Sequence, residues 1–286
     1  MWVAYALGSA FFAGITSILA KCGIRNTDSH VATAIRTIVV LIFSWLMVFI
    51  TGSEKQFSNI DTTAAVFLLL SGLATGASWL CYFKALQEGD INKVVPVDKS
   101  STILTMMLAF IFLGEAITSL KVFCIILIGL GTMLMIQKRR GDETQHNGKM
   151  WFVYALLSAV FASLTAILGK IGINGIDSNL GTAIRTIVVL VMAWVVVFAA
   201  NKQRSIYSVP KNEMSFICLS GIATGASWMC YYRALQEGLA CVVVPIDKLS
   251  ILVTIVFSYI VFKEKLTRKA GTGLIMIVVG TLLMLV

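Results

Sequence analysis

The sequence predicts an all-α integral membrane protein of ten transmembrane helices, arranged as two inverted five-helix repeats. Two observations lead to this fold class: the chain is strongly apolar, and it contains itself twice. Of its 286 residues, 58% are hydrophobic and 13% are charged, and the mean hydropathy is +0.89. A soluble domain of this length does not reach such values, so lipid is the expected solvent. Residues 1–137 align without a gap onto residues 150–286, with every position shifted by 149.

Each repeat divides into five apolar runs, each long enough to cross a bilayer core of about 30 Å as a helix. The predicted helices of the first repeat are 2–20, 31–51, 64–86, 93–113 and 119–137, and those of the second are 151–169, 180–200, 213–235, 242–262 and 268–286. Residues 138–149 are hydrophilic and form a predicted linker that is too short for a catalytic domain. The expected organisation is two five-helix units joined by this linker.

An odd number of helices in each repeat inverts the second repeat relative to the first, and the positions of Lys and Arg agree with the inversion. In the first repeat these residues favour the turns after helices one and three and the linker, whereas in the second they favour the turns after helices two and four. Under the positive-inside rule, both patterns place the linker in the cytoplasm and both termini outside. The net charge of +9 therefore orients the chain, and nucleic acid is not expected as a partner.

Charged residues inside the apolar runs are the first candidates for a binding site, because a charge within a membrane is costly and usually faces a cavity or a partner. They are Asp98, Lys99, Asp247 and Lys248, at matching places in the fourth helix of each repeat. On one face of this helix, serine and threonine accompany each aspartate one and two turns further on. The alternative interpretation makes each aspartate an N-terminal helix cap and lets each lysine reach the interface.

The third helix carries a strip of aromatic and hydroxyl side chains that recurs in both repeats. Its members are Thr75, Trp79 and Tyr82 in the first repeat and Thr224, Trp228 and Tyr231 in the second. This strip is either the wall of a substrate cavity or a set of interfacial aromatic anchors. The same helix contains Gly72-x-x-x-Gly76, repeated as Gly221-x-x-x-Gly225, a spacing that lets membrane helices approach closely.

Two arginines, Arg36 and Arg185, lie about one turn inside the second helix of each repeat, where each either grips a carboxylate or phosphate or extends to the interface. Lys21 and Lys170 allow the same two interpretations. A weaker polar face on the first helix, including Ser9 and its counterpart Ser158, is consistent with helix packing alone.

The glutamates at the helix ends favour structural roles. Glu88 and Glu237 each precede a glycine and are interpreted as helix ends with a glycine cap. Glu115 and Glu264 are interpreted as turn residues.

Several of these features together resemble a known family. The chain has Ala20-Lys21 at the end of the first helix, the early arginine of the second, and Leu113-Gly-Glu-Ala-Ile-Thr118 closing the fourth. With the Val-Pro-x-Asp-Lys stretch of both repeats, it resembles the EamA branch of the drug/metabolite transporter superfamily, and each half resembles the five-span members of that family. The resemblance implies a transporter of small metabolites with a central cavity between the halves.

The expected function is therefore secondary transport of a small organic metabolite, amino-acid-like or amphiphilic and cationic, by alternating access, with export as the expected direction. No P-loop is present, so a proton gradient or exchange is the expected driving force. The expected partners are this substrate and the lipid of a bacterial-type inner membrane, for a monomer or homodimer with no cofactor and no metal. Enzymatic activity is not expected. The alternative is a membrane scaffold or a lipid-acting membrane protein without transport.

Overall fold

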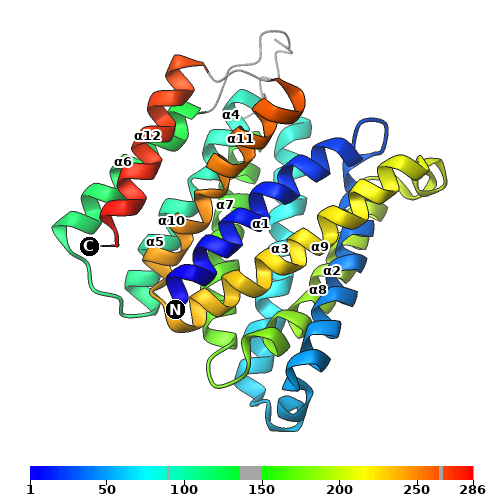
Figure 1. Ribbon diagram of the computed structural model, residues 1–286, viewed down its shortest axis with the longest axis horizontal. Coiled ribbons are helices and arrows are strands. Elements are labelled where there is room, and N and C mark those ends of the chain that lie inside the picture. The colour runs from blue at the N-terminus through cyan, green and yellow to red at the C-terminus, as the bar shows by residue number, and fades with distance from the viewer. Residues whose placement is uncertain (89–90, 136–149, 264–266, 286) are drawn as a thin grey trace.

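A computed structural model describes residues 1–88, 91–135, 150–263 and 267–285 of the protein. Every regular element in these ranges is helical, as the sequence predicts (Figure 1). The first half contains α1 (Trp2–Gly23), α2 (Ser29–Thr51), η1 (Ser53–Asn59), α3 (Thr62–Glu88), α4 (Ile91–Lys99), α5 (Ser101–Phe112) and α6 (Ser119–Met135). The second half contains α7 (Met150–Gly172), α8 (Ser178–Ala199), η2 (Gln203–Ser208), α9 (Lys211–Glu237), α10 (Ala240–Lys248), α11 (Ser250–Phe262) and α12 (Arg268–Leu283). The predicted linker 138–149, Gly89 and Glu264 lie outside the described residues.

Aspartate caps fix where the second helix of each half begins. Asp28 accepts a hydrogen bond from the backbone N–H of His30 at 2.9 Å, and Asp177 accepts one from Asn179 at 2.9 Å. These carboxylates satisfy N–H groups that have no partner inside the helix, and their charge is favourable at the positive end of the helix dipole. Helix α2 ends at Gly52, whose φ of +68° is a left-handed conformation that glycine adopts without strain.

The fourth predicted helix of each half is broken near its middle. Residues 93–113 form α4 and α5, which meet at Ser100, and residues 242–262 form α10 and α11, which meet at Leu249. Pro245 lies inside α10 rather than at a helix start. Because proline removes an N–H donor and crowds the preceding turn, it weakens the helix just before the break.

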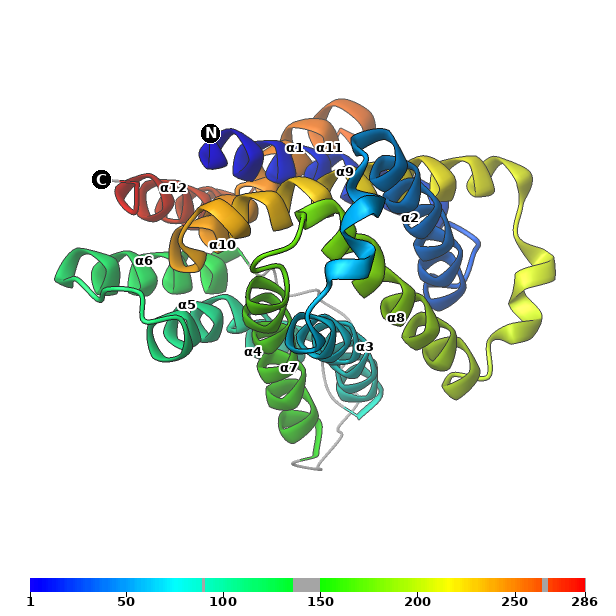
Figure 2. The same cartoon turned by 90° about the horizontal axis from the view of Figure 1, so that it is seen from below.

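The two halves pack by exchanging helices. Helix α1 of the first half packs along α9 of the second, and α7 of the second packs along α3 of the first; α2 pairs with α8, and α6 with α12. Figure 2 shows the result as two groups, α1 with α9 to α12 and α7 with α3 to α6, with α2 and α8 beside them. Each group therefore contains the first helix of the opposite half.

The close helix approach predicted from the glycines of the third helices is confirmed. A Cβ added to Gly72 of α3 would lie 2.7 Å from Cβ of Val188 in α8, and one added to Gly221 of α9 would lie 2.6 Å from Cβ of Val39 in α2. Real Cβ atoms do not approach so closely. Glycine at these two positions is therefore what lets the third helix of each half pack directly on the second helix of the other.

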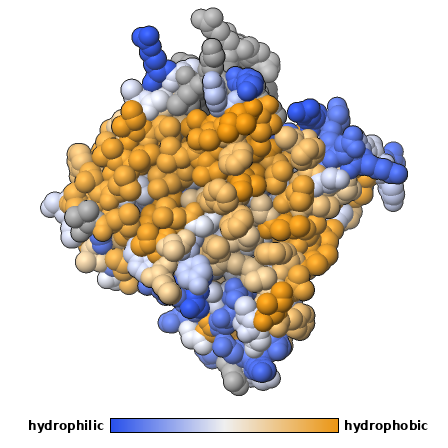
Figure 3. Space-filling view, viewed as in Figure 1, coloured by the Kyte–Doolittle hydropathy of each residue, from blue (hydrophilic) through white to orange (hydrophobic). Residues whose placement is uncertain are grey.

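On the face shown in Figure 3, a broad apolar area lies between polar residues at the two ends. Among the described residues, seven helices are long and apolar enough to cross a membrane: α1, α2, α3, α7, α8, α9 and the continuous stretch Ala240–Val261 of α10 and α11. Helix α6 is apolar but shorter. The N-terminus and the end of α12 lie at one end of the molecule, here called the terminal end, and α6 ends and α7 begins at the other, the linker end (Figure 1).

Candidate functional site

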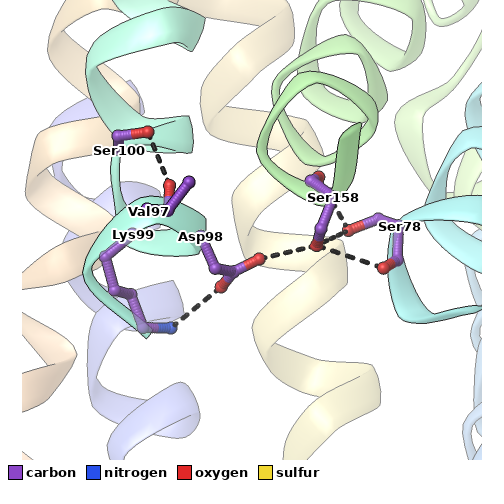
Figure 4. A network of polar contacts seen from close by, with 6 residues as sticks. All are labelled: Ser78, Val97, Asp98, Lys99, Ser100 and Ser158. Carbon is purple, nitrogen blue, oxygen red and sulfur yellow. Dashed lines mark hydrogen bonds and ion pairs between the residues drawn. The ribbon is translucent and has the colours of Figure 1, made fainter. Parts of the chain in front are cut away.

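In the first half, Asp98 lies in the last turn of α4 and is hydrogen-bonded to the second half (Figure 4). Ser158 Oγ of α7 donates to Asp98 Oδ1 at 2.7 Å, and this hydroxyl lies 3.3 Å from Ser78 Oγ of α3. Lys99 Nζ lies 3.9 Å from Asp98 Oδ2, but the lysine side chain is 53% exposed, so the pair is weak. The interpretation of Asp98 as an N-terminal cap is wrong, because α4 begins at Ile91.

The second half repeats this arrangement with the roles of the halves exchanged. Ser9 Oγ of α1 donates to Asp247 Oδ1 at 2.6 Å and lies 3.3 Å from Ser227 Oγ of α9. Helix α10 begins at Ala240, so the cap interpretation is wrong for Asp247 too. Each carboxylate is thus held by a serine of the opposite half, and neither site is complete within one repeat.

These serines are residues that sequence reasoning undervalues. Ser9 and Ser158 belong to a weaker polar face that helix packing alone would also explain, and Ser78 and Ser227 are not singled out. Their one available signal is recurrence at a spacing of 149 residues, which many packing residues share. Nothing in a hydropathy pattern distinguishes a serine that binds a carboxylate from one that lets two helices approach.

The two lysines add positive charge beside these carboxylates. Lys99 and Lys248 lie near enough for their charges to repel one another, although they belong to different halves. Tyr82 is near enough to Asp98 for the carboxylate charge to act on its hydroxyl. The structure therefore gathers Lys99, Asp98 and Tyr82 at the interface between the halves.

Arg185 is the most enclosed charge of the candidate set. Its residue surface is 3% exposed, and its guanidinium reaches from α8 to α3 of the other half. Nε donates to Ser71 Oγ at 2.9 Å, and Nη2 donates to Thr75 Oγ1 at 2.6 Å. The guanidinium carbon lies 5.1 Å from the ring centre of Trp228 and 5.0 Å from that of Tyr232, both in α9. The interpretation of Arg185 as a side chain that extends to the interface is wrong.

Tyr231 connects this cluster to the second aspartate. Its hydroxyl lies near enough to Arg185 and Asp247 for both charges to act on it. The predicted residues Thr75, Trp228, Tyr231, Arg185 and Asp247 are therefore gathered in one region. We call Arg185 with Ser71, Thr75, Trp228 and Tyr232 the Arg185 cluster.

The counterpart of this cluster in the first half is arranged differently. Arg36 is half-buried, and among the residues that the structure describes its Nη2 donates only to Thr33 Oγ1 of its own helix, at 3.4 Å. Thr224, the counterpart of Thr75, donates to the carbonyl of Ser220 at 2.7 Å, as Thr75 does to that of Ser71, but among the described residues it accepts no hydrogen bond from Arg36. Trp79 packs against a small apolar cluster on α2 and α8. Arg36, Thr224 and Trp79 thus lie outside the Arg185 cluster, although the sequence assigns them the same role.

At the terminal end, Glu115 joins the two halves. Its side chain is 3% exposed, and its oxygens accept the backbone N–H groups of Ala240 at 2.6 Å and Cys241 at 2.9 Å, at the start of α10. Lys170 Nζ lies 3.1 Å from Glu115 Oε1 and also donates to the carbonyl of Gly238 at 2.7 Å. Burial raises the pKa of Glu115, but the hydrogen bonds from Cys241 and Ala240 and the charge of Lys170 outweigh it and hold that pKa below its ordinary value.

This terminal latch, formed by Glu115, Lys170 and the start of α10, refines what the sequence predicts for its residues. Glu115 does lie in a turn, but it is buried and caps a helix of the other half. Lys170 neither extends to the interface nor is free to bind a substrate. Nearby, α9 ends at Glu237 with Gly238 as its C-cap, as predicted, although Gly238 is extended at φ −111° rather than left-handed.

At the linker end, the protein is hollowed by a cavity of about 350 Å³. It lies between the start of α2, the end of α3, the start of α7 and the end of α8. His30, Cys81, Phe83, Lys84 and Tyr154 are among the residues that line it. The two ends of the molecule therefore differ, although the sequence repeat would allow them to be alike.

Long apolar helices, a broad apolar area on the surface and charged groups shared between two halves define a multi-pass membrane protein built around a polar interior. In the described part of the chain, no group of three or more His, Cys, Asp or Glu side chains is placed to hold a metal ion.

Comparison with known proteins gives the family. The model of the EamA-like transporter family matches residues 1–137 and 149–286. The chain belongs to this family and is a membrane transporter, a multi-pass protein of the bacterial-type inner membrane. Its family is one of transporters rather than enzymes, and membership implies a small-molecule substrate and a membrane environment.

Individual relatives agree with this assignment. An uncharacterized transporter encoded in the cobO 3′ region of Sinorhizobium sp is 42% identical over 136 residues, which are 48% of this chain and 96% of that protein. The uncharacterized transporter YxxF of Bacillus subtilis (strain 168) is 24% identical over 197 residues, 68% of this chain and 60% of that protein. A solved structure titled only as the crystal structure of a protein has a TM-score of 0.73 at 14% identity, over 97% of this chain and 94% of its own. At that identity the likeness shows the fold alone.

Proposed function

We propose that this protein is a secondary transporter that exports a small organic metabolite, amino-acid-like or amphiphilic and cationic, by alternating access and without any enzymatic step. The proposal treats residues 1–137 and 150–286 as two inverted five-helix units, which together make ten spans. The exchange of helices between the halves supports it. So does the Sinorhizobium relative, since nearly all of that protein matches about half of this chain.

The difference between the two ends is the observation that carries the proposal. At the terminal end, the latch closes on the start of α10, α8 packs on α9, and α10 packs on α5. Within the described residues, the repeat-related pairs α2 with α3 and α4 with α11 make no comparable contact, and the cavity lies at that linker end. If the halves exchanged these arrangements, the linker end would close and the terminal end would open. Such an exchange is alternating access between inverted repeats.

The binding site of this proposal lies between the halves, where the charged and aromatic candidates come from both. Asp98 and Asp247 are its coupling candidates, because a carboxylate shared between two moving halves can take up and release a proton as its surroundings change. Exchange of one substrate for another is the other form of coupling. The proposal requires only one chain, so it accommodates a monomer or a homodimer. The proposed substrate-binding set is Thr75, Trp79, Tyr82, Asp98 and Lys99 with Thr224, Trp228, Tyr231, Asp247 and Lys248, together with Arg36 and Arg185.

Transport by purified protein in lipid vesicles tests the proposal. Radiolabelled amino acids, sugars and organic cations would be offered with and without a pH gradient, with protein-free vesicles as the control. We expect at least one compound to accumulate, or to exchange with a preloaded unlabelled pool. If folded, inserted protein moves none of them, the scaffold or lipid-acting alternative is favoured instead.

A further inference from the structure

The guanidinium of Arg185 is a buried positive charge without an acidic partner among the described residues, where no carboxylate oxygen lies within the 4.0 Å of an ion pair. A charge removed from water in this way is costly unless something compensates it. Two hydroxyl groups accept hydrogen bonds from it, but neither carries a charge. Nη1 is fully enclosed and has no hydrogen-bond partner within the described ranges.

The geometry around this group leaves one edge of the guanidinium without a hydrogen-bond partner among the described residues. The guanidinium packs against the aromatic rings of Trp228 and Tyr232. Ser71 and Thr75 occupy the edge formed by Nε and Nη2. The remaining edge, Nη1 with the second N–H of Nη2, is the end-on edge that a carboxylate grips with two oxygens.

The hydroxyl groups on the occupied edge are themselves fixed. Ser71 Oγ donates its proton to the carbonyl of Thr165 at 2.7 Å, and Thr75 Oγ1 donates to the carbonyl of Ser71 at 3.0 Å. Both hydroxyl oxygens therefore present lone pairs to Arg185 and hold its guanidinium group in one orientation. A donor fixed in position before its ligand arrives loses less entropy on binding.

The charge of the candidate residues favours the same kind of ligand. The proposed substrate-binding set contains four cations, Arg36, Arg185, Lys99 and Lys248, against two carboxylates, Asp98 and Asp247. An anionic group on the substrate would reduce this imbalance, whereas a purely cationic substrate would increase it.

We infer that Arg185 is the substrate's carboxylate-binding residue, gripping the carboxylate through Nη1 and Nη2 between Trp228 and Tyr232. This inference rests on the proposed transport function and narrows its substrate class to amino-acid-like compounds and other small carboxylates. The charges of Arg185 and Asp247 both act on Tyr231, so a cationic group on the same substrate would find its counter-charge at Asp247. In the conformation described here the site is enclosed, so a ligand reaches it only when the contact between α8 and α9 loosens.

Ligand-induced thermal stabilisation of the purified protein tests the assignment without requiring transport. The probes are the twenty standard amino acids, together with matched compounds that separate the charges: L-leucine, 4-methylpentanoate without the ammonium group, and 3-methylbutylamine without the carboxylate. We expect at least one carboxylate to stabilise the wild type and its decarboxylated amine not to do so. Arg185→Gln should weaken that binding by roughly tenfold or more, since a charged hydrogen-bonded pair is lost.

Two further variants keep the test valid if Arg185→Gln folds poorly. Thr75→Val removes the acceptor that holds Nη2 but keeps the charge and the side-chain volume, and it should weaken carboxylate binding with little effect on amines. Arg233→Gln makes the same charge change on the half-exposed surface of α9, where Arg233 pairs with Glu237, and it should bind carboxylates as the wild type does.

The inference is overturned if no carboxylate stabilises the wild type, if only amines do, or if carboxylate affinity is unchanged in both Arg185→Gln and Thr75→Val. These outcomes are separable from failure of the proposed function. Vesicle transport of an organic cation alone would leave transport standing and remove the carboxylate site. Carboxylate binding without any vesicle transport would leave the carboxylate site standing and count against the transport function.

Discussion

Replacing Glu115 with glutamine should release the terminal latch. The amide oxygen can still accept one backbone N–H of α10, but the ion pair with Lys170 and the second backbone bond are lost. Breaking a fully buried ion pair costs roughly 3–5 kcal/mol. Because the Lys170 side chain is 19% exposed and solvent screens its charge in part, we take a lower figure of about 2.5 kcal/mol for the pair with Glu115. Loss of the charge at the start of α10 adds about 0.5 kcal/mol. A total of about 3 kcal/mol corresponds to a shift of roughly 100-fold toward the open terminal end.

Cys241 is a built-in reporter of this opening, because it lies at the start of α10 and is 0% exposed. With the other five cysteines replaced by serine, maleimide should label Cys241 roughly 100-fold faster in Glu115→Gln than in the parent, if labelling follows the open population. Glu237→Gln is the matched control, since it removes a carboxylate at the same end that pairs with Arg233 rather than α10. A labelling rate that changes by less than about threefold in Glu115→Gln would refute this account of the latch.

The acidity of Glu115 gives the same latch a pH dependence. Its pKa lies below the ordinary value, so its contribution to closure is fully present above the ordinary glutamate pKa and is lost as pH falls through the lowered one. Cys241 labelling in the parent should therefore be insensitive to Glu115 protonation at neutral and mildly acidic pH, once corrected for the pH dependence of thiol reactivity itself. An opening that titrates near pH 7 would assign the pH response to another group.

Three other predictions follow from the interior and the charge pattern. A reporter that is active only in the cytoplasm should work when fused near Asp142 and fail at Val286, and the reverse result would overturn the orientation. If protons are coupled, Asp98→Asn or Asp247→Asn should abolish gradient-driven accumulation yet spare exchange at equal pH, whereas full pH dependence in both variants and in the double variant would exclude the pair. Trp228→Ala should weaken substrate binding about 3- to 30-fold, since a cation–π contact of about 0.5–2 kcal/mol is lost; unchanged affinity in a folded variant would leave Trp228 a packing residue.

The sequence predicts the helices well because each long apolar run has a polar boundary. The predicted helix 64–86 is observed as Thr62–Glu88, for example, and 119–137 as Ser119–Met135. The break in the fourth helix is not predicted, because the apolar run continues through Leu249 and hydropathy does not report a kink. The cap interpretation of Asp247 fails for the same reason, since the aspartate lies at the middle of the span rather than at its start.

Partners across the halves are the part of the site that the sequence does not reveal. Glu115 is 125 residues from Ala240, whose N–H it accepts, and no local pattern connects them. The inequality of Arg36 and Arg185 is equally invisible, because both occupy the same place in the repeat. The two arginines differ in their partners, since Arg185 donates to Ser71 and Thr75 of the other half and Arg36 to Thr33 of its own helix.

The exchange of first helices also sets the order in which this chain can fold. Ser9 is bonded to Ser227, which lies 218 residues later, and to Asp247, which lies 238 residues later, so α1 has its polar partners only after more than half of the second half has been made. Contacts this distant in sequence carry a large loop-closure cost and form late. The first half therefore cannot settle into its native packing while it is being synthesised. It must remain in the membrane with its serine face unsatisfied, and α1 completes its native contacts only when α9 and α10 arrive.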